Sequence, residues 1–187
     1  MKKRCQWAGE QPIMIDYHDM EWGAAVHEDR LLFEFLVLEG AQAGLSWSTV
    51  LKKRAHYKKV FDNFAVEKIA RYDEKKREAL LSDPGIIRNR LKIEATISNA
   101  QACLALFDQG ETLDSWLWRF VDGRPIQNSW LRPEAIPTQT SESEAMSREL
   151  KRRGFRFVGP TICYAFMQAT GMVNDHTIDC FRHAELA

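Results

Sequence analysis

Two cysteines and two histidines lie close to the two ends of this 187-residue chain: Cys5, His18, His176 and Cys180. Thiolate sulfur and imidazole nitrogen are ligands that a zinc ion prefers, and four of them complete a tetrahedral shell. A catalytic zinc usually keeps one position open for water, so a closed set of four favours a structural ion. We therefore interpret the set as a structural Zn²⁺ site, one per chain, that ties the two ends of the chain together.

The spacing of these four residues leaves an alternative open. His176 and Cys180 are four residues apart, which places both side chains on one face of a helical turn. The twelve residues between Cys5 and His18 are enough for a loop to fold back. Strong zinc motifs carry closer pairs, so on spacing alone the cysteines are equally well explained as small buried residues and the histidines as surface residues.

A glutamate is a second residue whose position favours chemistry. Glu39 follows three large apolar residues by three, four and seven positions, and therefore shares a helical face with Leu36, Phe35 and Leu32. A carboxylate on such a face is costly unless it is paired or used, and desolvation raises its pKa. The alternative is a solvated side chain at a helix end, because Gly40 follows directly.

Large aromatic residues are concentrated in the first quarter of the chain: Trp7, Tyr17, Trp22 and Trp47. Taken one by one, tryptophans in a helical protein are usually core residues. Around a buried carboxylate, however, aromatic rings form a pocket suited to a flat or cationic ring. These four residues are therefore candidates for the walls of a binding pocket.

Two glycines, Gly154 and Gly159, interrupt a basic stretch between two predicted helices. Such a turn exposes backbone N–H groups, and the second helix places the positive end of its dipole nearby, which suits a phosphate. Four basic residues add positive charge for a nucleic-acid backbone: Lys151, Arg152, Arg153 and Arg156. Other basic clusters, at residues 52–59 and 88–92, are usually solvated helix faces, and the same explanation remains open here.

Apolar periodicity and capping residues predict an all-α protein, with the whole of 1–187 as a single domain. Helices are expected over 29–39 with Asp29 as N-cap, after Ser46, from Asp73 to the break at Pro84, and over 89–107. A capping box at 141–144 begins a helix that reaches 153, and Pro160 begins another that stops at Gly171. We find no run of alternating residues that predicts a strand.

Composition excludes several classes of protein. The chain has 26 basic and 26 acidic residues, so its net charge gives no reason to invoke a nucleic acid or a membrane. No apolar run approaches membrane-spanning length, and no signal peptide is recognisable. We interpret Cys103 and Cys163 as core residues rather than disulfide partners, and we expect a cytoplasmic protein.

Four blocks of the sequence resemble the 3-methyladenine DNA glycosylase I family, in order and over nearly the whole chain. They are Tyr17-His18-Asp19-x-Glu21-Trp22-Gly23, Leu38-Glu39-Gly40-x-Gln42-Ala43-Gly44-Leu45-Ser46-Trp47, Gly154-Phe155-x-Phe157-Val158-Gly159 and Val173-Asn174-Asp175-His176. The second block is highly specific. The resemblance implies a helix-hairpin-helix glycosylase fold, with the hairpin motif near 142–171 and a structural zinc joining residues 5–18 to residues 176–180.

The resemblance also implies roles for individual residues. Cys5, His18, His176 and Cys180 correspond to the zinc ligands. Glu39 corresponds to the residue that recognises the flipped base, in a pocket lined by Trp7, Tyr17, Trp22 and Trp47. Contacts with DNA are expected from Gly44, Leu45, Gly154, Gly159 and Thr161, with Leu45 filling the gap left in the duplex.

Two features depart from the wider superfamily. The hairpin reads Phe155-Arg156-Phe157-Val158-Gly159 in place of a leucine-proline-glycine turn. The usual catalytic aspartate is also lacking in the resembled family, and Asp175 is the nearest acid that invites that assignment. Because Asp175 precedes His176, we expect it to support that ligand or to cap a turn.

The resemblance implies a bacterial base-excision repair enzyme that flips 3-methyladenine out of alkylated double-stranded DNA and hydrolyses its N-glycosidic bond. Its products are the free base and an abasic site. We expect a monomer, which is the default for a DNA repair enzyme of this size. No lysine is placed for a Schiff-base step, so we expect a monofunctional enzyme. Two alternatives from other classes are a non-catalytic helical DNA-binding module and a zinc hydrolase with one dispensable ligand.

Overall fold

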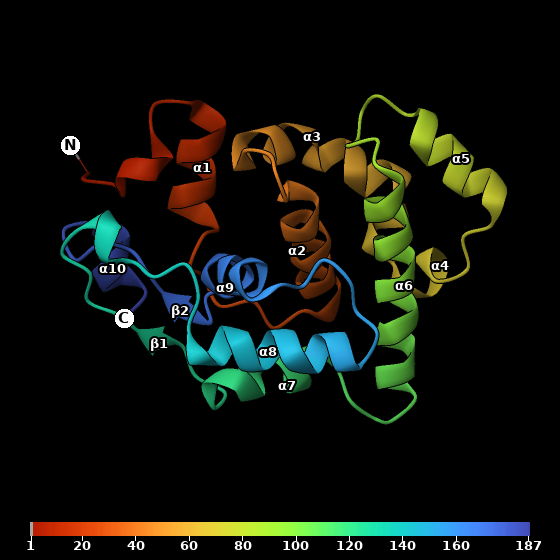
Figure 1. Ribbon diagram of the computed structural model, residues 1–187. Helices are drawn as coiled ribbons and strands as arrows, with labels where there is room; N and C mark the ends of the chain where they lie inside the picture. The colour runs from red at the N-terminus through yellow and green to blue at the C-terminus, as the bar shows by residue number, and fades with distance from the viewer. Residues whose placement is uncertain (1) are drawn as a thin grey trace.

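A computed structural model describes residues 2–187 as a mainly helical protein in which the first and last helices lie on the same side (Figure 1). The α-helices are α1 Pro12–Met20, α2 Asp29–Gln42, α3 Trp47–Val60, α4 Val66–Ile69, α5 Glu74–Ser82, α6 Arg90–Phe107, α7 Leu113–Leu117, α8 Ser141–Arg152, α9 Pro160–Ala169 and α10 Phe181–Glu185. Short 3₁₀ helices span Gln6–Ala8, Asp62–Phe64, Trp118–Val121 and Pro133–Ala135. Among residues 2–187, none of the helices is both long and apolar enough to cross a membrane.

Helix α2 runs through the centre of the molecule (Figure 1). Ten successive residues, 32–41, are buried, so this helix is covered on every side, by α3, α6, α7 and α9 among others. A helix that is buried all round is normally apolar all round. Two carboxylates, those of Glu34 and Glu39, nevertheless lie within this stretch. The central helix therefore carries two buried acids, of which the sequence indicated only Glu39.

The predicted helices are present, and three of their starts are confirmed by capping hydrogen bonds. Ser46 caps α3 by accepting from the Thr49 N–H group, and Asp73 and Asn89 cap α5 and α6 in the same way. The α9 helix begins at Pro160, as expected.

Two expected caps are wrong by one residue. Glu28 precedes α2, because the Asp29 carboxylate instead accepts from the distant Asp114 N–H group at 2.9 Å. The capping box of α8 joins Thr140 and Ser143 rather than Ser141 and Glu144, because Thr140 is the last extended residue before the helix.

A short parallel ladder corrects the expectation that strands are absent. Strand β1, Ile126–Gln127, pairs with β2, Val173–Asn174. Two residues are too few for a periodic sequence signal, and their pairing depends on contacts between distant segments. The segment after β2 also differs from the expected helical turn. His176 lies in a stretch without regular secondary structure, and Cys180 closes a turn by donating its N–H to the Thr177 carbonyl at 2.8 Å, just before α10.

The glycine hairpin joins α8 to α9 and is held by side chains from elsewhere in the chain. Asn99 of α6 bonds both backbone groups of Arg156, accepting from its N–H at 2.7 Å and donating to its carbonyl at 3.0 Å. Gly154 has φ +89°, a conformation that favours glycine. Gly40 allows Phe157 to approach α2 closely, because a Cβ atom at residue 40 would lie 3.2 Å from the Phe157 Cβ. The hairpin is thus docked beside Glu39.

Lys92 does not belong to an exposed basic face. Its ammonium group donates to the carbonyl oxygens of Ala41 and Ala43, at 2.8 and 2.7 Å, and burial lowers its pKa. Carbonyls at a helix C-terminus lack partners within the helix, so Lys92 caps α2 from α6. This cap holds the start of the loop between α2 and α3.

We expect Lys92→Met to lower the free energy of unfolding by about 1–3 kcal/mol, because two partly buried carbonyls lose a charged donor while the aliphatic stem is retained. Urea unfolding measures the effect. Lys59→Met, at an exposed position on α3, is the matched control. If Lys92→Met lowers the free energy of unfolding no more than Lys59→Met does, Lys92 does not act as a cap of α2.

Candidate active site and metal centre

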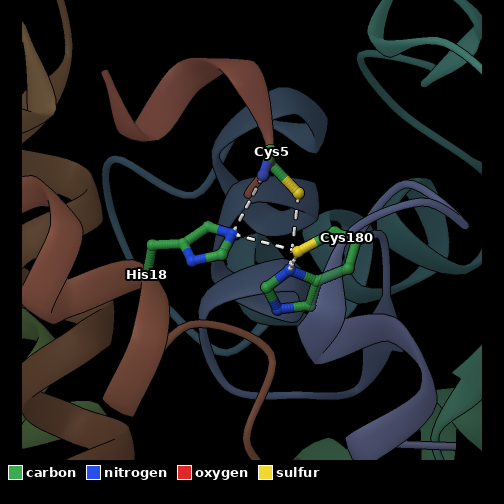
Figure 2. A group of neighbouring side chains, drawn as sticks. Cys5, His18 and Cys180 are labelled. Atoms are coloured by element: carbon green, nitrogen blue, oxygen red, sulfur yellow. Dashed lines mark hydrogen bonds between the residues drawn. The ribbon is translucent and has the colours of Figure 1, made fainter. Parts of the chain in front are cut away.

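The four terminal Cys and His residues form a buried cluster, which we call the terminal Cys/His cluster (Figure 2). The His176 Nδ1 atom lies 3.4 Å from the Sγ atoms of both Cys5 and Cys180, and His18 Nε2 lies 3.4 Å from Cys180 Sγ. All four candidate ligand atoms lie within 4.8 Å of one another. Ligands at zinc bond lengths around a tetrahedral centre lie about 3.3–3.8 Å apart, so the donor set and its size fit zinc. The alternative of surface histidines is wrong, since both are fully buried.

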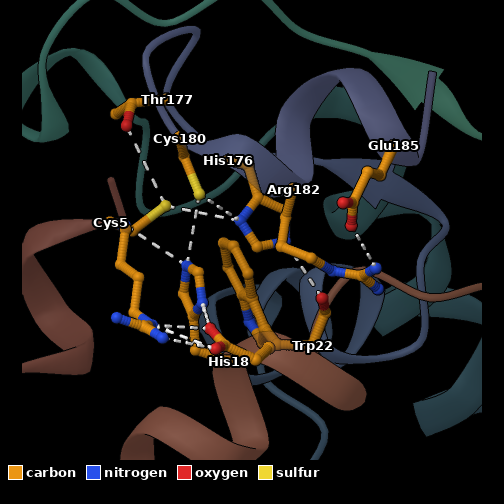
Figure 3. A network of polar contacts seen from close by, with 10 residues as sticks. Cys5, His18, Trp22, His176, Thr177, Cys180, Arg182 and Glu185 are labelled. Atoms are coloured by element: carbon orange, nitrogen blue, oxygen red, sulfur yellow. Dashed lines mark hydrogen bonds and ion pairs between the residues drawn. The ribbon is translucent and has the colours of Figure 1, made fainter. Parts of the chain in front are cut away.

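The outward nitrogen of each histidine has an acceptor that fixes the orientation of its ring (Figure 3). His18 Nδ1 lies 2.8 Å from Asp19 Oδ1, and His176 Nε2 lies 3.0 Å from the Trp22 carbonyl oxygen. Arg4 bonds the Asp19 carboxylate and, with His18, lowers its pKa to about 2. Such outer partners select the tautomer that leaves the other nitrogen unprotonated, as a metal ligand must be. In His18 this nitrogen, Nε2, accepts from the Cys5 N–H group at 3.2 Å.

Burial sets the protonation of the cluster in the absence of an ion. It lowers the pKa of His176 to about 4, so that imidazole is neutral, as a ligand must be. It raises the pKa of the Cys5 thiol to about 12. A cation is therefore required to form the Cys5 thiolate inside the protein.

A cavity of about 300 Å³, which we call the aromatic cavity, lies beside the cluster. Its lining residues are Trp7, Met14, Tyr17, Trp22, Glu39, Gln42, Trp47, Ile136, Ala165 and Gln168. All four aromatic residues selected from the sequence are among them, together with Glu39. The volume is at the lower end of the range for small-ligand pockets, about 300–1,000 Å³, and suits one planar ring system.

Rings of the cluster pack directly against the cavity walls. The Trp7 ring lies 5.3 Å from the His18 ring, and the Trp22 ring makes an edge-on contact with His176 at 4.6 Å between centroids. Tyr17 adjoins His18 in the chain, and its ring lies 5.4 Å from that of Trp47. The histidines thus support two of the aromatic walls, Trp7 and Trp22, from behind.

Glu39 is only 5% exposed, and the alternative of a solvated helix end is therefore wrong. Burial raises the pKa of its carboxyl group from 4.5 to about 8, with no ion pair or hydrogen bond within residues 2–187 to oppose the shift. The other buried acid of α2 is different, because Glu34 pairs with Arg54 at 2.6 Å and with Lys58 at 3.2 Å. Glu39 is the isolated acid.

A second hollow, of about 210 Å³, meets the aromatic cavity at Glu39, and we call it the Leu45 hollow. Its lining includes Gly44, Leu45 and Thr161, three of the residues expected to contact DNA. Leu45 is 44% exposed, which leaves this apolar side chain available to a partner. Gly154 and Gly159 lie on the hairpin, outside the lining of this hollow.

The basic residues of the hairpin divide into two groups. Arg152 pairs with Glu149 at 2.6 Å, and Arg153 lies over the Trp116 ring at 5.2 Å. Lys151 and Arg156 are exposed and make no ion pair within the described chain. Of the four basic residues of the hairpin, Lys151 and Arg156 are therefore the two that face solvent without a protein counter-ion.

Sequence reasoning missed the polar lining residue Gln168 and the use of Asp175. The Asp175 carboxylate is fully buried and accepts four hydrogen bonds, one of them from Gln168. Asp175 bonds neither histidine of the cluster, so the expectation that it supports His176 directly is wrong. Gln168 lies one turn before Gly171 on a largely apolar helix, and no spacing rule distinguishes it from a surface glutamine.

The chain is similar to known proteins over nearly its whole length. The methyladenine glycosylase family model matches residues 7–183. The chain is 48% identical to a DNA-3-methyladenine glycosylase of Haemophilus influenzae, over 96% of this chain and 97% of that protein. A crystal structure of 3-methyladenine DNA glycosylase I superposes with a TM-score of 0.94 at 51% identity, covering 96% of this chain and 98% of the other. A variant of such an enzyme crystallised with 3-methyladenine has a TM-score of 0.92 at 31% identity, covering 95% of this chain and 96% of the other.

The raised pKa of Glu39 predicts a pH dependence of stability. Glu39 binds a proton in the folded state up to about pH 8 but loses it near 4.5 when unfolded, so its contribution is present at low pH and is lost as pH rises. We expect Glu39→Gln to match the wild type near pH 4.5 and to exceed its free energy of unfolding by up to about 5 kcal/mol above pH 8. Urea unfolding of both proteins across this range is the measurement. Parallel pH profiles would show that the carboxyl titrates normally.

Proposed function

The chain belongs to the methyladenine glycosylase family, and from this premise we propose that it hydrolyses the N-glycosidic bond of 3-methyladenine in alkylated DNA. The observation that carries this proposal is the isolated Glu39 carboxyl group within an aromatic cavity. We propose that the cavity receives the damaged base, the Leu45 hollow receives the adjoining DNA and the terminal Cys/His cluster holds one structural Zn²⁺ ion.

The cavity offers groups that match alkylated adenine. N3-alkylation gives the nucleotide base a positive charge, which is attracted to the faces of Trp47 and Tyr17 and to an ionised Glu39. The indole N–H groups of Trp7 and Trp47 are buried and have no acceptor within residues 2–187. The ring nitrogens of a purine supply such acceptors, and the adenine amino group supplies a donor for Glu39.

Because of its charge state, Glu39 is expected to make unmodified adenine a poor ligand. With its pKa near 8, Glu39 is largely protonated at neutral pH when the cavity is empty. A cationic base favours the ionised carboxylate and is bound as an ion pair, whereas neutral adenine leaves the cost of ionising a buried acid uncompensated. The same group thus distinguishes the damaged base by its charge.

A base in a duplex must leave the stack to reach this cavity. The Leu45 hollow opens at Glu39, so an extruded nucleotide places its base among the aromatic rings and its backbone along Gly44, Leu45 and Thr161. We propose that Leu45 fills the space left in the duplex. We further propose that α8, the hairpin and α9 are a helix-hairpin-helix motif, in which Gly154 and Gly159 present the backbone to phosphate.

The chemistry required of the protein is modest, because a cationic base is already a good leaving group. Bond cleavage produces an oxocarbenium-like sugar that water attacks, giving free 3-methyladenine and an abasic site. None of the ten residues lining the aromatic cavity is a lysine, which supports a monofunctional glycosylase. Glu39 binds and orients the base during this step.

The proposed zinc has a structural role. When bound, it cross-links the thiolates and imidazoles of the four ligands, which lie at opposite ends of the chain. Four ligands of these types leave no open position, and this argues against the zinc-hydrolase alternative. Because His18 and His176 pack against Trp7 and Trp22, the ion also fixes walls of the aromatic cavity.

We expect the wild-type protein to release 3-methyladenine from methylated duplex DNA and Glu39→Gln to release it about 10–100-fold more slowly, because a charged acceptor becomes a neutral amide. Chromatography of the released bases measures both rates. Glu34→Gln is unsuitable as a control since Glu34 pairs with Arg54, so exposed Glu67→Gln on α4 serves instead. Equal rates for Glu39→Gln and wild type would remove Glu39 from the centre of the reaction.

We expect one zinc ion per chain by elemental analysis, and Cys180→Ala to lose it together with several kcal/mol of stability. Cys163→Ala, at a buried cysteine outside the cluster, is the matched control and keeps the metal.

Chelation of the wild type is expected to weaken binding of free 3-methyladenine, since two cavity walls lose support. Full binding of 3-methyladenine by the metal-free protein would contradict the proposal that the ion supports the walls of the aromatic cavity.

A further inference from the structure

Asp175 is the centre of a buried hydrogen-bond network outside the proposed reaction. Its Oδ1 atom accepts from the Asn128 amide and the Trp130 indole, both at 2.7 Å. Its Oδ2 atom accepts from the Tyr164 hydroxyl at 2.6 Å and from the Gln168 amide nitrogen at 2.8 Å. The β1–β2 ladder brings these partners together, because Asn128 and Trp130 follow β1 and Asp175 follows β2.

This network determines which way the Gln168 amide points. Both Asp175 oxygens act as acceptors, so only the amide NH₂ of Gln168 can face Oδ2. The Gln168 carbonyl oxygen is then directed away from Asp175, and it has no hydrogen-bond partner among residues 2–187. Gln168 is itself a lining residue of the aromatic cavity. A side chain with an unused acceptor, fixed in orientation from behind, therefore lines the cavity.

We propose that Asp175 is a positioning residue that holds the Gln168 carbonyl oxygen toward the aromatic cavity, where it accepts a hydrogen bond from a ligand N–H group. The inference rests on the proposed function and deepens it. Glu39 on α2 and Gln168 on α9 then present two acceptors, which suits a ring bearing an exocyclic amino group with its two hydrogens. A ring with a carbonyl in that place offers no such hydrogens.

The substitution Asp175→Asn tests the orientation specifically. In the variant, Oδ1 still accepts from Asn128 and Trp130, while an NH₂ group replaces Oδ2. The Tyr164 hydroxyl rotates to accept, and the Gln168 amide must turn over so that its oxygen faces residue 175. The amide NH₂ then points into the cavity, and an acceptor becomes a donor.

Titration calorimetry measures the binding of two free bases, 3-methyladenine and 3-methylhypoxanthine. The second base has a carbonyl oxygen in place of the amino group. We expect the ratio of their association constants to shift toward 3-methylhypoxanthine by about tenfold in Asp175→Asn. A structural defect lowers binding of both bases by the same factor and leaves the ratio unchanged, and that outcome would overturn the proposal.

Two further variants separate positioning from folding. In Asp175→Asn/Gln168→Glu, a carboxylate accepts from the new amide and presents its second oxygen to the cavity, so the wild-type preference for 3-methyladenine is expected to return. Gln168→Met removes the acceptor while keeping the side-chain length, and adding Asp175→Asn to it is expected to leave the ratio unchanged. A further shift in that background contradicts action through Gln168.

Controls address the neighbouring cluster and the proposed function. Zinc content is measured for each variant, and loss of metal together with the shift would assign the effect to the cluster instead. Trp130→Phe removes one donor from Oδ1 and leaves the Oδ2 contact with Gln168, so its ratio is expected to stay within about threefold of wild type. Failure of the wild type to release 3-methyladenine from DNA would refute the proposed function, whereas an active wild type with an unshifted Asp175→Asn variant would refute this inference alone.

Discussion

The convergence of Cys5, His18, His176 and Cys180 is the constraint on which the site depends. Chain ends are usually the least ordered parts of a domain, yet here residues 171 positions apart in sequence, Cys5 and His176, lie in contact within the interior. The histidine rings form the rear support of Trp7 and Trp22, and the backbone of Trp22 in turn orients His176. The contacts that join the two ends of the chain therefore also support the walls of the binding cavity.

The two buried acids of α2 show how environment separates residues of one type. Glu34 and Glu39 lie on one central helix and are both nearly inaccessible. Arg54 and Lys58 neutralise Glu34, so that acid contributes to the structure. Glu39 has an aromatic cavity in place of a counter-ion, which leaves its charge to be balanced by what enters. The proposed preference for a cationic ring rests on that missing partner.

Local chemistry in the sequence was sufficient to predict α2, α3, α5, α6, α8 and α9 and the cap at Asp73, since these signals lie within a few residues. The shorter helices α1, α4, α7 and α10 were not predicted. Glu39 and the aromatic residues could be selected because their apolar spacing and density are also local, and the structure brings them together in one cavity. The β1–β2 ladder, the Asn99 clamp on the hairpin and the Lys92 cap join segments far apart in the chain. Periodicity carries no information on such pairings, and the same limit concealed the roles of Glu34, Gln168 and Asp175.

The closure of the chain has a consequence for synthesis. A ribosome completes Cys5 and His18 long before His176 and Cys180, so the segment bearing Trp7 and Tyr17 emerges without its structural support. The central helix and its neighbours fold from sequence already made, whereas the walls of the cavity are completed only when the last turn of the chain arrives. Chains that lack His176 and Cys180 consequently lack a finished binding cavity, because His176 packs against the Trp22 wall.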